Sequence, residues 1–471
     1  GAYMNTCFSC HALRAPLTDG FEPNQHIMDQ FTPSLLAPPL YHADGQIKEE
    51  VYVYGSFLQS KMYDEGVTCI DCHDAHSMKV KSQTNGLCLQ CHSAQTYQQE
   101  QHIRHPLDSA GAQCVNCHMP ETTYMGVDAR RDHSFRIPRP DLSIKYDTPN
   151  ACINCHQDQS NTWAANALTQ WHGQPEPVDK SQQHFMQLMH NRTLPLEQHL
   201  ALINDEDMPE IKRASALAML PYSTNMLTEY VVSKWITSEY PLIRLAVAQV
   251  GNLLADEDLL KSYKTLLDDK YKAVRVAAAN QMVAIGLEDS SSFNKAFKEL
   301  LASNENTSWR GEGLFNQSLV DLAAQQEQAA IYKLEQSIKL DPYFVSSYVN
   351  LADIYRRLQL LDKEAAVYNK ALNKVTKSAE LHYAYGMFLI RSNDKPASIE
   401  QFKLAMKFDS ENPQYAYLYF LALDAVGKTQ LALVQLKQVF NKYNKDSNLR
   451  NLGLSFAQKL RDRTSFEFFN K

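Results

Sequence analysis

Ten cysteines and five histidines form one repeated pattern in the first third of the chain. In each repeat two residues separate a pair of cysteines, and a histidine follows the second cysteine at once. This spacing is typical of c-type haem attachment. The two thiols form thioethers with one porphyrin, and the histidine is held beneath the ring as the proximal ligand of the iron. The pattern predicts five covalently attached haem c groups, at Cys7, Cys10 and His11; Cys69, Cys72 and His73; Cys88, Cys91 and His92; Cys114, Cys117 and His118; and Cys152, Cys155 and His156.

Three other uses of paired cysteines explain the pattern less well. Disulfides within each pair leave the five histidines unexplained. Zinc ribbons use Cys-x-x-Cys units in fours of cysteine, so five pairs leave one over. Iron–sulfur clusters do not need the trailing histidine. Haem attachment is therefore the interpretation that the residues favour.

The second axial ligand separates an electron carrier from an enzyme. Iron with protein ligands on both faces shuttles electrons, whereas iron with one open face can bind a small substrate. Five irons need five distal ligands, and six further histidines lie between residues 12 and 150: His26, His42, His76, His102, His105 and His133. Met119 or Met125 is an alternative ligand for one iron.

Two short spacings among these histidines predict closely packed haems. His76 lies three residues after the proximal His73, and so short a link cannot wrap around a porphyrin. His76 is therefore expected to bind the iron of a neighbouring haem. His102 and His105 are likewise too near each other to bind opposite faces of one iron.

Length and composition are those of a globular protein with more than one domain. The chain has 471 residues, 44% hydrophobic and 21% charged, with a net charge of −7. This balance predicts neither a nucleic acid nor an anionic membrane as partner. There is no run of about 18 apolar residues, so no transmembrane segment is expected. Since the first motif starts at Cys7, no signal peptide precedes it, and Gly1 is expected to be a processed or truncated start.

Residues 1–160 are expected to form a loop-rich pentahaem cytochrome c domain. Roughly thirty residues per haem cannot build a conventional hydrophobic core, so the haems themselves are predicted to form it. Prolines are frequent here, as at Pro38-Pro39, and restrict the loops. Short helices are expected after several motifs, with little sheet.

Beyond the motifs the pattern is helical and repetitive. Residues 161–171 and 182–190 are predicted helices. Arg213, Arg244 and Arg275 then recur at a spacing of 31, each followed by small residues, which predicts HEAT-like repeats in which the arginines tie adjacent turns. From about residue 310 a period of 34 appears, typical of tetratricopeptide repeats, and predicts about four helix pairs.

The predicted fold is thus mostly α: residues 1–160 hold the haems, 161–305 form a helical linker and HEAT-like repeats, and 306–471 form tetratricopeptide-like (TPR) repeats. TPR arrays commonly contact other proteins.

The first 170 residues also resemble a family of bacterial multihaem cytochromes fused to HEAT and tetratricopeptide repeats. The matching stretches are residues 44–46, 54–62, 67–69, 117–120, 131–136 and 138–140. The resemblance implies an exported electron-transfer protein, periplasmic or extracellular. It also implies His42, His76, His105 and His133 as the leading distal ligands, with His102 next and His26 last. Family members carry further motifs upstream, so the chain is expected to derive from a longer polypeptide.

Two functions follow from these observations. The first is electron transfer through closely spaced haems with two histidine ligands each, the repeats docking redox partner proteins or copies of the chain, for example in an extracellular filament. The alternative is a multihaem reductase of a small nitrogen or sulfur oxyanion with one open haem. Asp132, Arg130 and Arg131 would then be its acid–base residues, although charges in this loop are expected to be solvated.

Overall fold

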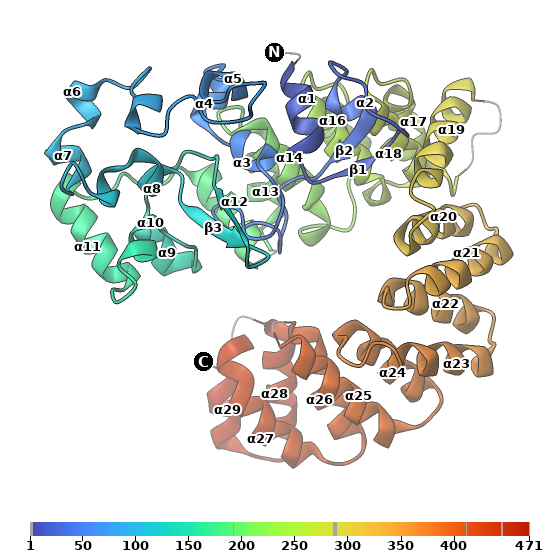
Figure 1. Ribbon diagram of the computed structural model, residues 1–471. Helices are drawn as coiled ribbons and strands as arrows, with labels where there is room; N and C mark the ends of the chain where they lie inside the picture. The colour runs from blue at the N-terminus through green and yellow to red at the C-terminus, as the bar shows by residue number, and fades with distance from the viewer. Residues whose placement is uncertain (1–2, 192, 286–289, 411, 444–445, 471) are drawn as a thin grey trace. The chain divides into compact units, whose positions relative to one another are not determined.

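The structure is a computed structural model that describes residues 3–191, 193–285, 290–410, 412–443 and 446–470. It divides into two compact units, Gly1–Asn306 and Thr307–Lys471 (Figure 1). Both units are mostly helical, and the only sheets in the described residues are two short antiparallel hairpins. The predicted mostly α fold is confirmed.

The N-terminal segment of the first unit has an apolar core of its own. It contains α1 (Tyr3–Cys10), α2 (Ile27–Gln30), α3 (Tyr54–Phe57), α4 (Lys61–Asp64) and a hairpin of β1 (Arg14–Pro16) with β2 (Phe31–Pro33). Phe8, Met28 and Tyr54 are among its buried side chains. The segment lies against later helices (Figure 1), because the Leu36 amide donates to Ser215 Oγ at 2.8 Å and Lys272 Nζ donates to the Leu17 carbonyl at 2.7 Å. It therefore has a rigid support far along the chain.

The segment with the other four motifs consists of short elements and loops. These are α5 (Cys69–Cys72), η1 (Asn85–Leu87), α6 (Ala94–Tyr97), α7 (Glu100–Ile103), η2 (Ala110–Ala112), α8 (Cys114–His118), the hairpin of β3 (Glu121–Tyr124) and β4 (Asp128–Arg131), α9 (Pro140–Tyr146) and α10 (Ala151–Cys155). Helices were expected after the motifs, but four of the motifs lie within or at the end of a helix. The reason is that the motif spacing itself matches one helical turn.

Longer helices follow from residue 161. They are α11 (Asn161–His172), α12 (Lys180–Asn191), α13 (Leu196–Asn204), α14 (Glu210–Ala218), η3 (Leu220–Tyr222), α15 (Glu229–Ile236), α16 (Pro241–Gln249), η4 (Gly251–Leu253), α17 (Asp256–Leu267), α18 (Lys272–Met282) and α19 (Ser291–Glu305). The Ser160 hydroxyl accepts from the Trp163 amide and begins α11. The helices predicted at 161–171 and 182–190 are present.

The three regularly spaced arginines tie neighbouring helices together. Helices α14, α16 and α18 contact one another in order and begin 31 residues apart. Arg244 donates to the Ser238 carbonyl at 2.6 Å and to Asp269 at 2.5 Å; Arg275 repeats this with the Asp269 carbonyl and Glu299, both at 2.8 Å. The structural role predicted for the arginines is confirmed.

The second unit is a regular stack of five helix pairs within the described residues. They are α20 (Gly311–Ala323) with α21 (Glu327–Leu340), α22 (Val345–Arg357) with α23 (Leu361–Leu372), α24 (Ala379–Arg391) with α25 (Lys395–Phe408), α26 (Pro413–Ala425) with α27 (Thr429–Val439), and α28 (Ser447–Lys459) with α29 (Arg463–Phe469), with η5 (Phe440–Tyr443) between the last two pairs. Both helices of each pair begin 34 residues after their counterparts, as in a TPR-like solenoid. The prediction of about four pairs was one short.

Candidate haem-binding site

Each cysteine–histidine motif folds as one helical turn. The histidine amide donates to the carbonyl of the first cysteine in four motifs, at 2.9 Å for His11, 2.8 Å for His73, 3.0 Å for His92 and 2.9 Å for His156. In the other motif His118 is the last residue of α8. Side chains three and four positions apart share one face of such a turn. Both thiols and the imidazole of a motif are therefore directed to one side of the backbone.

Local hydrogen bonds begin these turns. Before α5, Thr68 and Asp71 form a capping box. Before α10, Asn150 Oδ1 accepts from the Cys152 amide at 3.2 Å. Asn85 joins two motifs, because its Oδ1 accepts from the Cys114 amide at 2.9 Å while its Nδ2 donates to the Ala112 carbonyl.

Three motif histidines each face a second histidine from a distant part of the chain. With metal–nitrogen bonds of about 2.0 Å, two coaxial imidazoles on one iron have ring centroids about 6.2 Å apart. The observed centroid distances and interplanar angles are 6.4 Å and 22° for His73 with His133, 6.1 Å and 9° for His102 with His118, and 6.2 Å and 37° for His105 with His156. The spacing fits an iron between each pair.

The hydrogen bonds of these rings leave the Nε2 atom free to bind a metal. Nδ1 lies 2.7 Å from the Arg136 carbonyl in His118, 2.9 Å from the Ile103 carbonyl in His105 and 2.9 Å from the Arg131 carbonyl in His133. A carbonyl only accepts, so Nδ1 carries the proton and Nε2 keeps its lone pair. Iron-bound histidine needs this tautomer.

Burial also favours the neutral, metal-binding form of several imidazoles. It lowers the pKa of His133, helped by the charge of His73, while the bond to the Arg131 carbonyl acts in the other direction. Burial and the neighbouring His118 lower the pKa of His102. His11 has a pKa lowered by burial and by His73. A neutral imidazole is the ligand form, so these surroundings suit metal binding.

The remaining predicted ligands are arranged differently. Among the described residues, His42 and His76 face no other histidine at the spacing of the three pairs, and neither do the proximal His11 and His92. The ring of His92 meets the edge of Tyr97 at 5.5 Å. His26 Nδ1 accepts from the Met28 amide, so its Nε2 carries the proton and is a poor ligand. Met125 is 79% exposed.

Thiols of successive motifs lie next to one another. Burial and the hydrogen-bonded Cys7 thiol raise the pKa of Cys69 to about 11, and burial with the Cys114 thiol does the same for Cys88. The neighbouring thiols join the motifs in chain order: Cys7 with Cys69, Cys72 with Cys91, Cys88 with Cys114, and Cys117 with Cys152 and Cys155.

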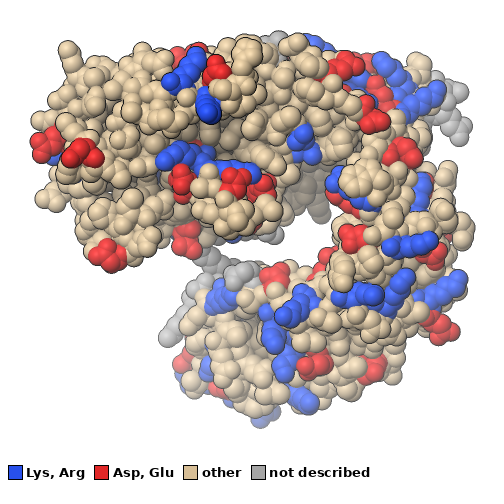
Figure 2. Space-filling model, viewed as in Figure 1, with Lys and Arg blue, Asp and Glu red and all other residues tan. Residues whose placement is uncertain are grey.

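The segment around the motifs has almost no apolar protein core. Within residues 59–145, all of which the structure describes, Ala112 is the one buried hydrophobic residue. Figure 2 shows that the end of the first unit bearing α6, α8, α10 and α11 presents few charged side chains. A segment of this length needs other apolar material to order it, and five porphyrins fit that need.

Sequence reasoning missed several residues around the histidines. Trp163 lies 4.8 Å from the ring of His156, and Trp171 lies 6.3 Å from that of His105. Asp132 was expected to be solvated, which is wrong: it is 8% exposed, because it accepts hydrogen bonds from Ile47 and Ser134. No local signal marks these residues, because their partners are far away in sequence.

Arg130 and Arg131 are also held by structural contacts. Arg130 pairs with Glu50 at 2.9 Å and with Asp128. Arg131 donates to the Met119 carbonyl at 3.1 Å, at the end of α8. Both arginines therefore serve the fold of the hairpin and of the fourth motif.

Two searches of the described residues for other kinds of site gave negative results. No three side chains of His, Cys, Asp or Glu converge as they would around a single metal ion. No helix has the length and apolar character needed to cross a bilayer.

Comparison with known proteins gives one family match. Residues 61–97, with the motifs of His73 and His92, match the family described as "Doubled CXXCH motif". This match supports covalent binding of haem c. A search of curated proteins finds no match.

The chain is also similar to solved TPR structures. "MamA 41-end from Desulfovibrio magneticus RS-1" is 14% identical, with a TM-score of 0.28 over 36% of this chain and 93% of that one. "YrrB: a TPR protein with an unusual peptide-binding site" is 15% identical, with a TM-score of 0.29 over 36% and 87%. PilF of Pseudomonas aeruginosa is 13% identical, with a TM-score of 0.30 over 41% and 88%.

Proposed function

We propose that this protein is a multihaem c-type cytochrome that transfers electrons, with five covalently attached haems held by residues 1–160. The observation that carries the proposal is the set of three facing histidine pairs, in which centroid spacings of 6.1–6.4 Å fit two axial ligands on one iron. Once bound, the haem irons supply reversible one-electron chemistry.

The residues of the chain supply attachment and rigid ligation. The two cysteines of each motif anchor one porphyrin, and the single helical turn holds the proximal histidine beneath it. Carbonyl groups fix the imidazoles of His105, His118 and His133. Because the ligands are held in place beforehand, a change of oxidation state requires little movement of the protein. His42 and His76 stay predicted ligands for the remaining irons.

The neighbouring thiols support a path through the motifs in chain order, from Cys7 to Cys155. Where thiols of successive motifs touch, the attached porphyrins have neighbouring edges. Close edges are what transfer from one haem to the next requires. The chain order therefore doubles as the order of transfer.

The helices from residue 161 onward are proposed to be HEAT-like repeats up to 305 and TPR repeats from 306, which dock redox partners or further copies of the chain. Stacked helix pairs present extended surfaces suited to protein contacts. Covalent haem attachment is completed outside the bacterial cytoplasm, which supports a periplasmic or extracellular location. A filament of stacked copies is one arrangement that this location and these surfaces allow.

Intact-mass measurement of the full chain purified from cells that attach haem c tests the proposal. The expected mass is that of the polypeptide plus five haems, and Cys88→Ser with Cys91→Ser together should remove one. A chain that carries no covalent haem would overturn the proposal. If reduced protein consumes nitrite, hydroxylamine or a sulfur oxyanion catalytically, the reductase alternative replaces simple electron transfer.

A further inference from the structure

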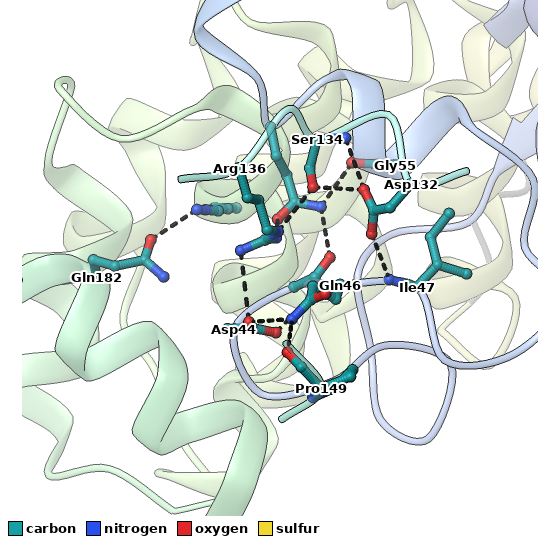
Figure 3. A network of polar contacts seen from close by, with 12 residues as sticks. Asp44, Gln46, Ile47, Gly55, Asp132, Ser134, Arg136, Pro149 and Gln182 are labelled. Atoms are coloured by element: carbon teal, nitrogen blue, oxygen red, sulfur yellow. Dashed lines mark hydrogen bonds and ion pairs between the residues drawn. The ribbon is translucent and has the colours of Figure 1, made fainter. Parts of the chain in front are cut away.

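A buried polar network lies beside the loop that carries His133. We call the network the clamp; it consists of Asp44, Gln46, Gln59, Asp132, Ser134 and Arg136 (Figure 3). All but Arg136 are at most 9% exposed. Buried polar groups are costly unless they are paired, so a network of this size is held for specificity of position.

Arg136 joins the loop to the N-terminal segment. Its Nε donates to Ser134 Oγ at 2.8 Å and its Nη2 donates to Gln59 Oε1 at 3.2 Å, while its Nη1 lies 3.9 Å from Asp44 Oδ2. Gln59 Nε2 in turn donates to the Gly45 carbonyl at 3.0 Å. The guanidinium therefore fixes the loop against a segment that has its own apolar core.

Asp132 makes the second attachment. Its Oδ2 accepts from the Ile47 amide at 3.1 Å, and its Oδ1 accepts from the Ser134 amide at 2.7 Å and from the Ser134 hydroxyl at 2.5 Å. Figure 3 shows Asp132, Ser134 and Arg136 from the loop meeting Asp44, Gln46 and Ile47. Loop residues 132–136 are thus held at both ends.

The same loop orients histidines of two different pairs. The Arg136 carbonyl accepts from His118 Nδ1 at 2.7 Å, and the Arg136 amide donates to the His118 carbonyl at 3.0 Å. The Arg131 carbonyl, next to Asp132, accepts from His133 Nδ1 at 2.9 Å. His118 faces His102, whereas His133 faces His73.

We propose that Arg136, through the clamp, is a positioning residue that sets the imidazole orientation and the reduction potential of two haems together, the one ligated by His118 and the one ligated by His73 and His133. The inference rests on the proposed function. The bond that Nδ1 donates governs the basicity of an iron-bound imidazole, so the two carbonyls tune both irons. Residues that bind neither iron thereby couple two sites.

The test uses the full-length, haem-loaded protein and the variant Arg136→Met. Arg139→Met is the matched control, because Arg139 is nearby and equally charged but its guanidinium pairs with Asp141 at 2.7 Å, outside the clamp. Haem content is checked by intact mass, and potentials are followed by a spectroscopic redox titration with low-temperature EPR. The signals of the two haems are assigned with His102→Ala and His133→Ala.

The expected result is a shift of the potentials and g-values of these two haems in Arg136→Met, larger than in Arg139→Met, with the other signals unchanged. Arg136→Lys should restore part of the shift. Ser134→Ala, which removes the hydroxyl at the centre of the clamp, should shift the same two haems if Arg136→Met does not fold. Full haem content with wild-type potentials and g-values in either variant would overturn the inference and leave the proposed function intact; loss of all covalent haem from the wild-type chain would overturn both.

Discussion

Replacing Lys212 by methionine should stabilise the first unit at neutral and acidic pH. Lys212 belongs to α14 and is 8% exposed, and its Nζ donates to Gln182 Oε1 at 2.7 Å. Burial, with a smaller contribution from the charge of Arg136, lowers its pKa from 10.5 to about 7. Folding therefore opposes protonation of this amine.

The sign of the pH dependence follows from the two proton affinities. Between about pH 7 and pH 10.5 the unfolded chain holds the proton and the folded chain has released it, so the free energy of unfolding rises with pH. Below pH 7 both states are charged and the folded state bears the whole cost. At about 1.4 kcal/mol for each tenfold change in proton affinity, this cost is about 5 kcal/mol. Methionine avoids it but loses a hydrogen bond worth about 1 kcal/mol, which leaves a gain of about 4 kcal/mol.

Thermal unfolding followed by far-ultraviolet circular dichroism measures the effect. At about pH 6 the Lys212→Met variant should melt on the order of 10 °C above the parent protein, and the difference should vanish near pH 10.5. Lys234→Met, at an exposed position of α15, is the control and should show no such trend. If Lys212→Met is less stable at pH 6, or gains equally at both pH values, the buried amine is not the origin of the effect.

Three further changes have expected outcomes. His105→Ala should turn one haem high-spin by removing the ligand opposite His156, visible by EPR, whereas His184→Ala should leave all signals unchanged. Arg275→Ala should lower the free energy of unfolding by about 1–3 kcal/mol in a denaturant titration, because it leaves Glu299 and the Asp269 carbonyl without their donor; an unchanged midpoint would contradict this. Gly55→Ala should cost about 1–3 kcal/mol, because the added methyl group overlaps the Tyr41 hydroxyl and Leu36, and a stable variant would show that this region repacks freely.

The motifs were predictable from sequence because each is complete within five residues. A single helical turn brings two thiols and an imidazole to one face, so neighbours in sequence are neighbours in space. The solenoid was predictable for a similar reason, since its period is local. The fifth helix pair escaped because its signature is weak: Gly453 packs against Phe469 in a pair whose second helix ends at residue 469.

The contacts between distant segments were not predictable. His133 lies beside His73, and Asp132 is buried by Ile47, although 60 and 85 residues separate the partners. The spacing of His102 and His105 did predict that they serve different irons, and the structure brings them to different motif histidines. It could not tell which ones, because that choice depends on how α7, α8 and α10 pack.

The facing histidine pairs are the centre of the account, and spin-quantified low-temperature EPR of the fully oxidised, full-length protein tests them most directly. Two imidazoles on one iron give low-spin ferric haem, and near-parallel ring planes give rhombic signals. The interplanar angles of 9°, 22° and 37° therefore predict rhombic low-spin signals from at least three haems. High-spin signals that leave fewer than three low-spin haems would contradict the assignment of these pairs as axial ligands.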